Sequence, residues 1–151
     1  MDIVDSTTRS RMMGQIRSRD TKPEMAVRRF LHANGFRYRL HDRKLPGRPD
    51  VVLPKYRTAI FVHGCFWHQH DGCPMAYTPS THREKWVEKF ASNKARDKRA
   101  LETLKQMDWN VIVVWECGLR KLSPNAVLSW LPNEIRQGKR SYIEWPSSEH
   151  A

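Results

Sequence analysis

The chain has 151 residues, the usual size of one domain, and its hydrophobic content of 39% excludes extended disorder. Because no apolar run approaches the ~20 residues of a spanning helix and the N-terminus lacks a signal-peptide pattern, we expect a cytoplasmic protein with no membrane partner. The 27 lysines and arginines outnumber the 16 acids, and the net charge of +11 predicts a polyanionic partner such as nucleic acid, with solubility alone as the alternative explanation.

The first half of the chain predicts a basic arm, one helix and several strands. Residues 1–20 are polar and basic, which indicates an arm. A helix is expected from Thr21, which has the spacing of a capping box with Glu24, to the C-cap position at Gly35. Alternating and continuous apolar patterns then predict strands over residues 36–40, 50–53 and 58–62.

The second half predicts two helices around one further strand. The longest helical stretch covers residues 82–107, and the apolar run 111–115 predicts a buried strand. A last helix is expected from Ser123 with Val127, Leu128, Leu131 and Ile135 inward, and residues 139–151 are expected to form a loose tail. The element order predicts an α/β fold in which one domain, residues 21–138, has a mixed central sheet flanked by helices.

The first chemical candidate combines Asp50 with His63. Asp50 begins one predicted strand after a proline turn, and His63 ends the next, so the two residues would lie side by side if the strands form a hairpin. A carboxylate there could hold Mg²⁺, which polarises phosphates and activates water. The alternative is a turn aspartate and a loop histidine with no chemical role.

The second candidate is a cysteine and histidine cluster. Three cysteines cannot form a closed set of disulfides, and no export signal is present. Cys65, His70 and Cys73 close a short loop, and Cys117 follows the strand 111–115, where it could tie that loop to the sheet. Thiolate and imidazole ligands suit tetrahedral zinc in a structural site, and buried thiols without metal are the alternative.

The third candidate is a group of aromatic residues. Phe66 and Trp67 lie in the same loop, and Trp86 lies near the start of the long helix. On a basic protein such rings can stack on bases or wedge between them, and core packing is the alternative, especially for Trp86. The basic residues of that helix could meet phosphates, although its interleaved acids are also typical of a solvated face. These acids are Glu84, Glu88 and Asp97.

Three motifs resemble the very-short-patch repair (Vsr) DNA mismatch endonucleases. They are L-P-G-R-P-D at residues 45–50, F-V-H-G-C-F-W-H at residues 61–68 and V-W-E-C at residues 114–117. The resemblance runs from about residue 7 to residue 120. It implies a restriction-endonuclease-like fold and Mg²⁺-dependent nicking of double-stranded DNA, 5′ to the thymine of a T:G mismatch left by 5-methylcytosine deamination. It also implies a structural zinc ion, a monomer, and downstream repair proteins as partners.

The resemblance assigns catalytic roles to individual residues. Asp50 and the backbone carbonyl of Val62 would bind Mg²⁺, and His63 and His68 would lie at the scissile phosphate. Glu24 would orient His68 from the first helix, a role that competes with helix capping for the same carboxylate.

The resemblance also assigns the zinc ligands and the DNA contacts. The expected zinc ligands are Cys65, His70, Cys73 and Cys117, with His68 or Asp71 as alternatives to His70 because the loop is one residue longer than usual. The expected wedge residues are Phe66, Trp67 and Trp86. The N-terminal arm would clamp the other groove, and the arm residues expected to contact DNA are Arg9, Arg11 and Met13.

One departure from the broader nuclease superfamily matters. That superfamily places an acid and a lysine on the second catalytic strand, whereas Phe61-Val62-His63 occupies that position here, so the Vsr variant alone fits. Two other functions stay open: a related zinc-containing nuclease for another lesion or site, and a zinc-stabilised DNA-binding module without catalysis. Asp50 favours the enzyme, because a pure DNA binder gains nothing from a carboxylate that repels phosphate.

Overall fold

The computed structural model describes residues 20–120, 123–139 and 141–147. Within these ranges the chain forms a five-stranded sheet in the order β1-β2-β3-β4-β5. The strands are β1 (Arg39–Leu40), β2 (Val51–Leu53), β3 (Thr58–His63), β4 (Asn110–Trp115) and β5 (Tyr142–Trp145). The pairs β1–β2 and β2–β3 are antiparallel, whereas β3–β4 and β4–β5 are parallel. The structure therefore confirms a single-domain α/β fold with a mixed central sheet.

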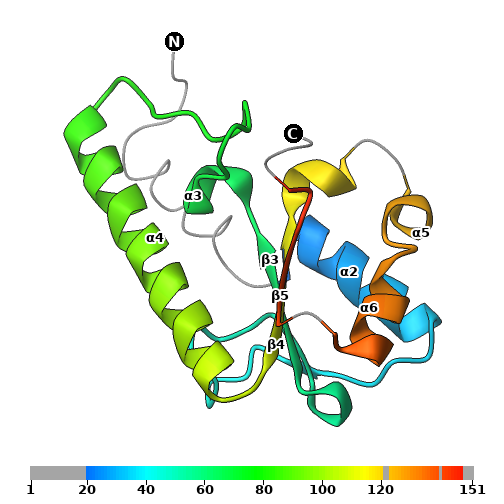
Figure 1. The fold of residues 1–151 in the computed structure, drawn as a ribbon. Helices are drawn as coiled ribbons and strands as arrows, with labels where there is room; N and C mark the ends of the chain where they lie inside the picture. Colours follow the sequence, from blue (N-terminus) through cyan, green and yellow to red (C-terminus); the bar gives the residue numbers. More distant parts are fainter. Residues whose placement is uncertain (1–19, 121–122, 140, 148–151) are drawn as a thin grey trace.

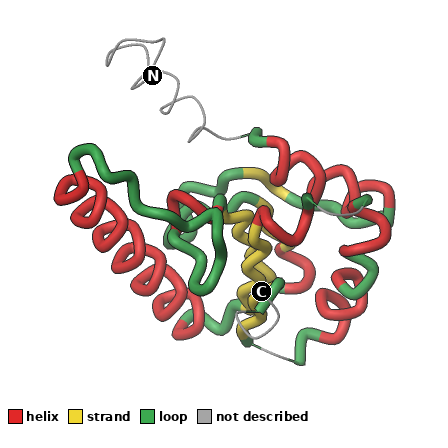
Figure 2. The backbone as a smooth tube through the Cα atoms, turned by 90° about the horizontal axis from the view of Figure 1, so that it is seen from above, coloured by secondary structure: helices red, strands yellow, loops and turns green. Residues whose placement is uncertain are grey.

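Helices cover both faces of this sheet (Figure 1). The long helix α4 (Arg83–Gln106) lies along one face, while α2 (Lys22–Ala33), α5 (Pro124–Val127) and α6 (Leu131–Gln137) lie on the other. The view from above shows the same layers, with the strands between the two groups of helices (Figure 2). The short helix α3 (Cys65–His68) follows β3, and two 3₁₀ turns, η1 (Pro54–Tyr56) and η2 (Glu116–Leu119), follow β2 and β4.

Each face of the sheet has its own apolar core. Toward α2, the core includes Val27, Leu31, Ile60, Ile112 and Leu131. Toward α4, it includes Ala59, Phe61, Leu104, Val111 and Val113. Because neighbouring residues of a strand point to opposite faces, a strand buried on both sides must be apolar throughout, which explains the continuous runs in β3 and β4.

The predicted ends of the two longer helices agree with the structure. Thr21 is the N-cap of α2, where its hydroxyl accepts a hydrogen bond from the Glu24 backbone N–H at 3.4 Å. Gly35, just beyond α2, has φ of +82°, a conformation that glycine adopts without steric cost. Helix α4 lies one residue inside each end of the predicted stretch 82–107.

Three predicted elements were wrong in extent. The predicted strand 36–40 is reduced to the two residues of β1, since Phe36 is buried against the core instead of alternating along a strand. The single last helix is two short ones, because Pro132 begins a new helix in the first turn of α6. The expected loose tail contains β5, which pairs with the outer edge of β4 and places Glu144 opposite Val113.

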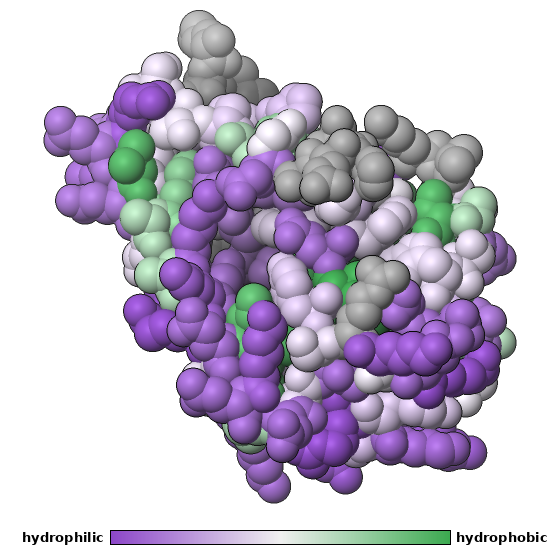
Figure 3. Space-filling model, in the orientation of Figure 1, coloured by the Kyte–Doolittle hydropathy of each residue, from purple (hydrophilic) through white to green (hydrophobic). Residues whose placement is uncertain are grey.

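The surface seen in the orientation of Figure 1 is largely hydrophilic, with small and separate apolar areas (Figure 3). Among the described residues, no helix combines the length and the apolar character needed to cross a membrane. Most of the buried apolar side chains belong to the two cores, and the exposed large ones among the described residues are Leu40, Tyr77, Val87 and Met107.

Candidate active site and metal cluster

Asp50 lies beside β3, as the predicted hairpin requires. The β2–β3 register pairs Val51 with Ile60, and the Val62 backbone N–H donates a hydrogen bond of 2.7 Å to Asp50 Oδ2. In a strand the N–H and C=O of one residue point toward the same edge, so the Val62 carbonyl faces the same side as the Asp50 carboxylate. The structure thus places the Asp50 carboxylate against the backbone of Val62, the residue whose carbonyl the resemblance assigned to Mg²⁺.

The electrostatics of Asp50 suit a cation. The pKa of Asp50 is raised to about 7, chiefly by burial; the charge and side-chain contact of Glu24 add to this rise, while the hydrogen bond from Val62 and the charge of His41 oppose it. Two carboxyl groups held together out of water must share a proton or receive a cation. Hard oxygen donors with this charge match the ligands that Mg²⁺ prefers.

Glu24 is almost fully buried, with 2% exposed, and its two oxygens have different partners. Oε1 accepts a hydrogen bond of 3.2 Å from the Asp20 backbone N–H at the start of α2. Oε2 lies 2.9 Å from His41 Nε2 and also accepts from Arg28 at 3.2 Å. Glu24 thus makes a contact at the helix end, to Asp20 rather than to the N-cap Thr21, with one oxygen and a contact to a histidine with the other.

The predicted contact between Glu24 and His68 was wrong. His68 Nδ1 lies 2.6 Å from Asp97 Oδ2, and Asp97 comes from α4 on the opposite face of the sheet. Glu24 contacts His41 instead, because α2 covers the other face. The orientation of His68 therefore depends on α4.

His63 and His68 form a stacked pair. Their ring centroids lie 3.8 Å apart and their planes differ by 4°. Burial lowers the pKa of His63 well below its ordinary value, with the nearby His68 and His70 as smaller causes, so His63 is neutral at physiological pH. With Asp97 bound to Nδ1 of His68, the remaining ring nitrogen of His68 is available to accept a proton.

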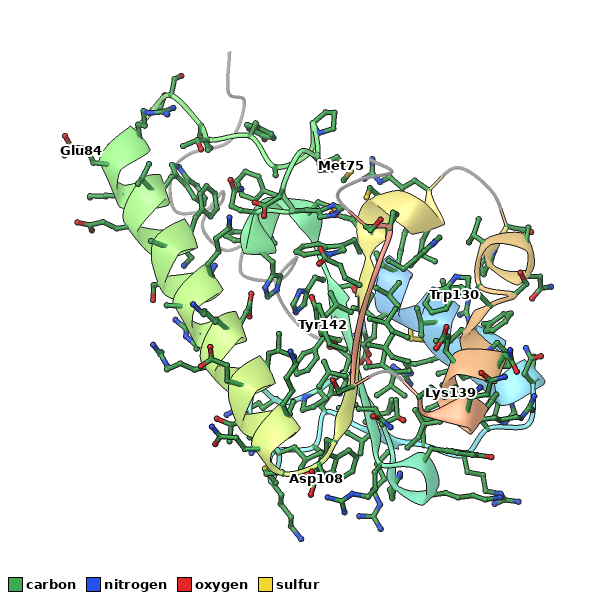
Figure 4. The ribbon with its side chains drawn as sticks, viewed as in Figure 1. Met75, Glu84, Asp108, Trp130, Lys139 and Tyr142 are labelled. Atoms are coloured by element: carbon green, nitrogen blue, oxygen red, sulfur yellow. The ribbon has the colours of Figure 1, made fainter. Side chains whose placement is uncertain are left out.

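A cavity of about 200 Å³ lies next to these histidines, between the sheet and α4. Its sheet side is apolar and aromatic, and it includes Tyr142, which lies on the side of β5 that faces α4 (Figure 4). The α4 side contributes Lys94 and Lys98, two cations beside His68 and Asp97. An anionic group that enters from solvent would therefore meet positive charge next to the stacked imidazoles.

The structure brings all four predicted zinc ligands together. One ligand atom from each of Cys65, His70, Cys73 and Cys117 lies within 4.8 Å of the others. His70 Nδ1 is 3.7 Å from Cys65 Sγ and 3.5 Å from Cys117 Sγ, so His70 rather than His68 or Asp71 belongs to this group.

The chemistry of this cluster fits a thiophilic metal. All three cysteines are free thiols in the structure. Burial raises the pKa of the Cys65 and Cys117 thiols and lowers the pKa of His70, so it favours the neutral forms of these three groups. Three sulfurs and one imidazole nitrogen form a donor set that suits tetrahedral zinc, and binding would displace the thiol protons.

The predicted wedge residues form one half-buried aromatic cluster. Phe66 lies 5.1 Å from Trp67, 5.4 Å from Trp86 and 5.2 Å from Phe90, measured between ring centroids. Tyr77 joins the cluster at 5.1 Å from Phe66 and keeps 61% of its surface exposed. The rings therefore support one another and still present an edge to solvent.

The structure adds site residues that the sequence did not single out, Asp97 and His41. Asp97 is interleaved with lysines and arginines on a helix, a pattern typical of a solvated face, so no sequence signal identified it. His41 follows the short β1, and its backbone N–H donates to the Asp50 carbonyl at 3.2 Å. The predicted DNA contacts Arg9, Arg11 and Met13 lie outside the described residues.

Comparisons with known proteins identify the family. Residues 1–74 match the family described as DNA mismatch endonuclease Vsr. The chain is 44% identical to the DNA mismatch endonuclease Vsr of Escherichia coli, covering 89% of this chain and 87% of the relative. It is 46% identical to the type II nicking enzyme V.XorIIP of Xanthomonas oryzae (80% and 88% covered) and 44% identical to V.NmeAIP of Neisseria meningitidis (79% and 84%). The chain therefore belongs to the Vsr family of DNA mismatch endonucleases.

Proposed function

We propose that this endonuclease nicks one strand of double-stranded DNA 5′ to the thymine of a T:G mismatch, with Mg²⁺ as the catalytic ion and zinc as a structural one. The observation that carries the proposal is the arrangement at the ends of β2 and β3. There the oxygen donors Asp50 and Val62 adjoin the strand end from which His63 stacks on His68. A pure DNA-binding module has no use for such an arrangement.

In this proposal the Asp50 carboxylate and the Val62 carbonyl hold Mg²⁺. When bound, the ion supplies positive charge that polarises a phosphate oxygen and favours ionisation of water. The buried contact between Glu24 and Asp50 supports this role, because it concentrates negative charge where a cation can neutralise it. Glu24 also acts on the far side of the site, where it fixes His41 and Arg28.

His68 is the proposed general base. Asp97 accepts the Nδ1 proton of His68, which leaves the lone pair of Nε2 free to take a proton from the attacking water. The neutral His63 packs face to face on the same ring and prevents it from tilting. The basic residues Lys94 and Lys98 beside the cavity would attract the DNA backbone.

The aromatic cluster is the proposed reader of the mismatch. A wobble T:G pair is unstacked more easily than a matched pair, so Phe66, Trp67 and Trp86 enter beside it at lower cost. Unstacking costs a few kcal/mol and aromatic stacking returns roughly 1–3 kcal/mol per base, so a small difference decides where the rings insert. Helix α3 carries both Phe66 and His68, so insertion also positions the catalytic histidine.

Zinc and the N-terminal arm complete the proposal. Zinc bound by Cys65, His70, Cys73 and Cys117 would fix the loop after α3 to the end of β4. Arg9, Arg11 and Met13 would contact the groove opposite the aromatic cluster, and the arm's positive charge would hold the phosphates.

A nicking assay tests this function. Duplexes that differ only in one pair (T:G, U:G, T:A or C:G) are labelled in turn on each strand and incubated with the zinc-loaded protein, with and without Mg²⁺. We expect one nick, 5′ to the mismatched thymine, on the T:G duplex in Mg²⁺. Denaturing gels give the position of the cut.

Two variants control the assay. Asp50→Asn should abolish nicking and keep binding to the duplex. Asp108→Asn, a change of the same kind just before β4 at the other end of the sheet, should cut normally. Cleavage of the T:A duplex at the same rate would reject the mismatch specificity. Cleavage by Asp50→Asn at the parent rate would reject the metal assignment, and binding without cleavage by the parent would leave the DNA-binding module as the function.

A further inference from the structure

The second ring nitrogen of His70 lacks a hydrogen-bond partner among the described residues. Its side chain is fully buried, and Nδ1 faces the sulfurs of Cys65 and Cys117. Nε2 points away from them and makes no hydrogen bond. An imidazole that binds metal through Nδ1 must carry its proton on Nε2, and a buried donor without an acceptor costs roughly 1–3 kcal/mol.

Glu144 of β5 is the carboxylate nearest to this nitrogen. Glu144 Oε1 lies 3.9 Å from His70 Nε2, slightly beyond hydrogen-bond distance. The carboxylate is already oriented, since it accepts 2.8 Å from Trp115 Nε1 and 3.2 Å from the Tyr142 hydroxyl. The Pro146 carbonyl also approaches the His70 ring, but a carboxylate is the stronger acceptor because it is charged.

Trp115 connects the same carboxylate to the catalytic histidines. Its ring stacks on His70 at 4.2 Å with planes 10° apart, and its edge meets His63 at 5.1 Å. Trp115 also pairs with His63 in the β3–β4 register. Trp115, whose Nε1–H donates to Glu144, therefore contacts both a ligand of the metal cluster and one of the stacked histidines.

The chain packs tightly where β5 passes this cluster. A Cβ atom on Gly118, the residue after Cys117, would lie 2.6 Å from the Trp145 ring and 2.8 Å from Pro146. The contact leaves no room for β5 to move closer to Gly118 and Cys117. The pairing of β5 with β4, which places Glu144 opposite Val113, limits movement in the other direction.

We infer that Glu144 is a positioning residue for the metal cluster. Its carboxylate accepts a hydrogen bond from the Nε2–H of His70 and so holds the ring with Nδ1 toward the metal. This inference rests on the proposed zinc site. Metal-bound histidines commonly donate their other N–H to a carboxylate, and loss of that partner typically costs 10–100-fold in metal affinity. A small rotation of His70 when the metal binds would close the 3.9 Å separation.

The test measures zinc affinity of the full chain by competition with a chromophoric chelator. Glu144→Ala should weaken zinc binding 10–100-fold, and Glu144→Gln, which keeps a neutral acceptor, should lie between that variant and the parent. The control Glu102→Ala, which removes an exposed carboxylate of α4, should stay within twofold of the parent.

Long-range ¹H–¹⁵N spectra of the zinc-loaded protein give a readout that simple loss of packing would not change. In the parent, His70 should bind zinc through Nδ1 and carry a slowly exchanging proton on Nε2. In Glu144→Ala, folded and saturated with zinc, that proton should exchange faster with water.

Three results of these measurements would overturn the assignment of Glu144. If Glu144→Ala binds zinc as tightly as Glu102→Ala, Glu144 has no such role, and the Pro146 carbonyl is the acceptor. If the parent itself binds no zinc, the zinc site and this inference fail together. If the parent binds zinc and His70 is ligated through Nε2, the inference alone is overturned.

Discussion

Asp50 is held in the folded chain at an electrostatic cost. Its pKa rises to about 7 from an ordinary 3.8, because burial and Glu24 disfavour its charged form. Between these two values the folded chain keeps a proton that the unfolded chain has released. The contribution of Asp50 to stability therefore falls as the pH rises from about 4 to about 7.

Replacement of Asp50 by asparagine should remove that cost. In the absence of Mg²⁺, Asp50→Asn should gain stability relative to the parent as the pH rises from 4.5 to 8, by about 3 kcal/mol, since one pKa unit corresponds to 1.36 kcal/mol. Urea unfolding at several pH values measures the difference. Saturating Mg²⁺ should stabilise the parent and not the variant, and a difference that stays constant with pH would contradict the argument.

The contact between His68 and Asp97 predicts a catalytic effect far larger than its effect on folding. Asp97→Asn keeps the shape of the side chain but removes the charge that stabilises a protonated His68. We expect a fall of about 10²-fold in the single-turnover nicking rate, within the usual range for general-base catalysis, with unchanged DNA binding. Asp108→Asn, at an exposed aspartate beyond the C-terminal end of α4, is the matched control. Equal rates for parent and Asp97→Asn would exclude a role for Asp97 in proton transfer.

Residue types and spacing could predict which side chains carry chemistry, but not which of them touch. The metal cluster was predictable as a group, because cysteine and histidine side chains at this spacing are typical ligands of a metal ion. Its members are Cys65, His70, Cys73 and Cys117. The partner of His68 was not predictable from the sequence, since both Glu24 and Asp97 are acidic residues on helices. Only the packing of those helices on opposite faces of the sheet decides between them.

Among the elements, α3 and the start of α4 act together by holding the aromatic cluster. Trp67→Ala should lower nicking at T:G at least about tenfold, because stacking returns roughly 1–3 kcal/mol per base. Salt-sensitive binding to a T:A duplex should change little, since it depends on lysines and arginines. The control is Trp109→Ala, at the other end of α4, where the ring packs near Arg57. If Trp67→Ala lowers the T:G nicking rate and the affinity for the T:A duplex by the same factor, Trp67 is a packing residue.

The close approach of β5 to η2 predicts a steric effect on stability. Gly118→Ala should destabilise the protein by about 1–3 kcal/mol, the usual cost of overpacking, because its Cβ would overlap Trp145 and Pro146. Gly64→Ala is the control, since its Cβ would meet other atoms only at 3.7 Å. Urea unfolding compares the two variants. Similar stability of both would show that β5 can shift away from η2.

The strength of the apolar pattern in the sequence explains which helices and strands were predictable. The strands β3 and β4 are buried on both faces, so their runs are apolar throughout, and α4 is long enough to show its period. Strand β5 has four half-buried residues at the edge of the sheet, with a glutamate among them. Its pairing depends on β4, and no local pattern of that length distinguishes such a strand from a tail.

For the whole molecule, the metal cluster joins the loop after α3 to the end of β4. Removal of zinc by a strong chelator should therefore lower the unfolding temperature by about 10 °C or more, since each kcal/mol is worth about 2–4 °C at this size. Calorimetry before and after chelation measures the shift, and added zinc should restore it. Cys117→Ser should reproduce the loss without a chelator. Release of zinc with no change in the unfolding temperature would exclude a structural role.

The parallel pairing of β3 with β4 has a consequence for the order of folding. It places His63 opposite Trp115, and the cluster unites His70 with Cys117, 47 residues further along the chain. Forming contacts between residues so far apart in the sequence first costs the entropy of closing the loop between them. We therefore expect these contacts to form late in folding, and together. A partly folded chain thus already carries every catalytic side chain named here without the geometry that cuts DNA. An incompletely folded chain is therefore expected to leave DNA uncut.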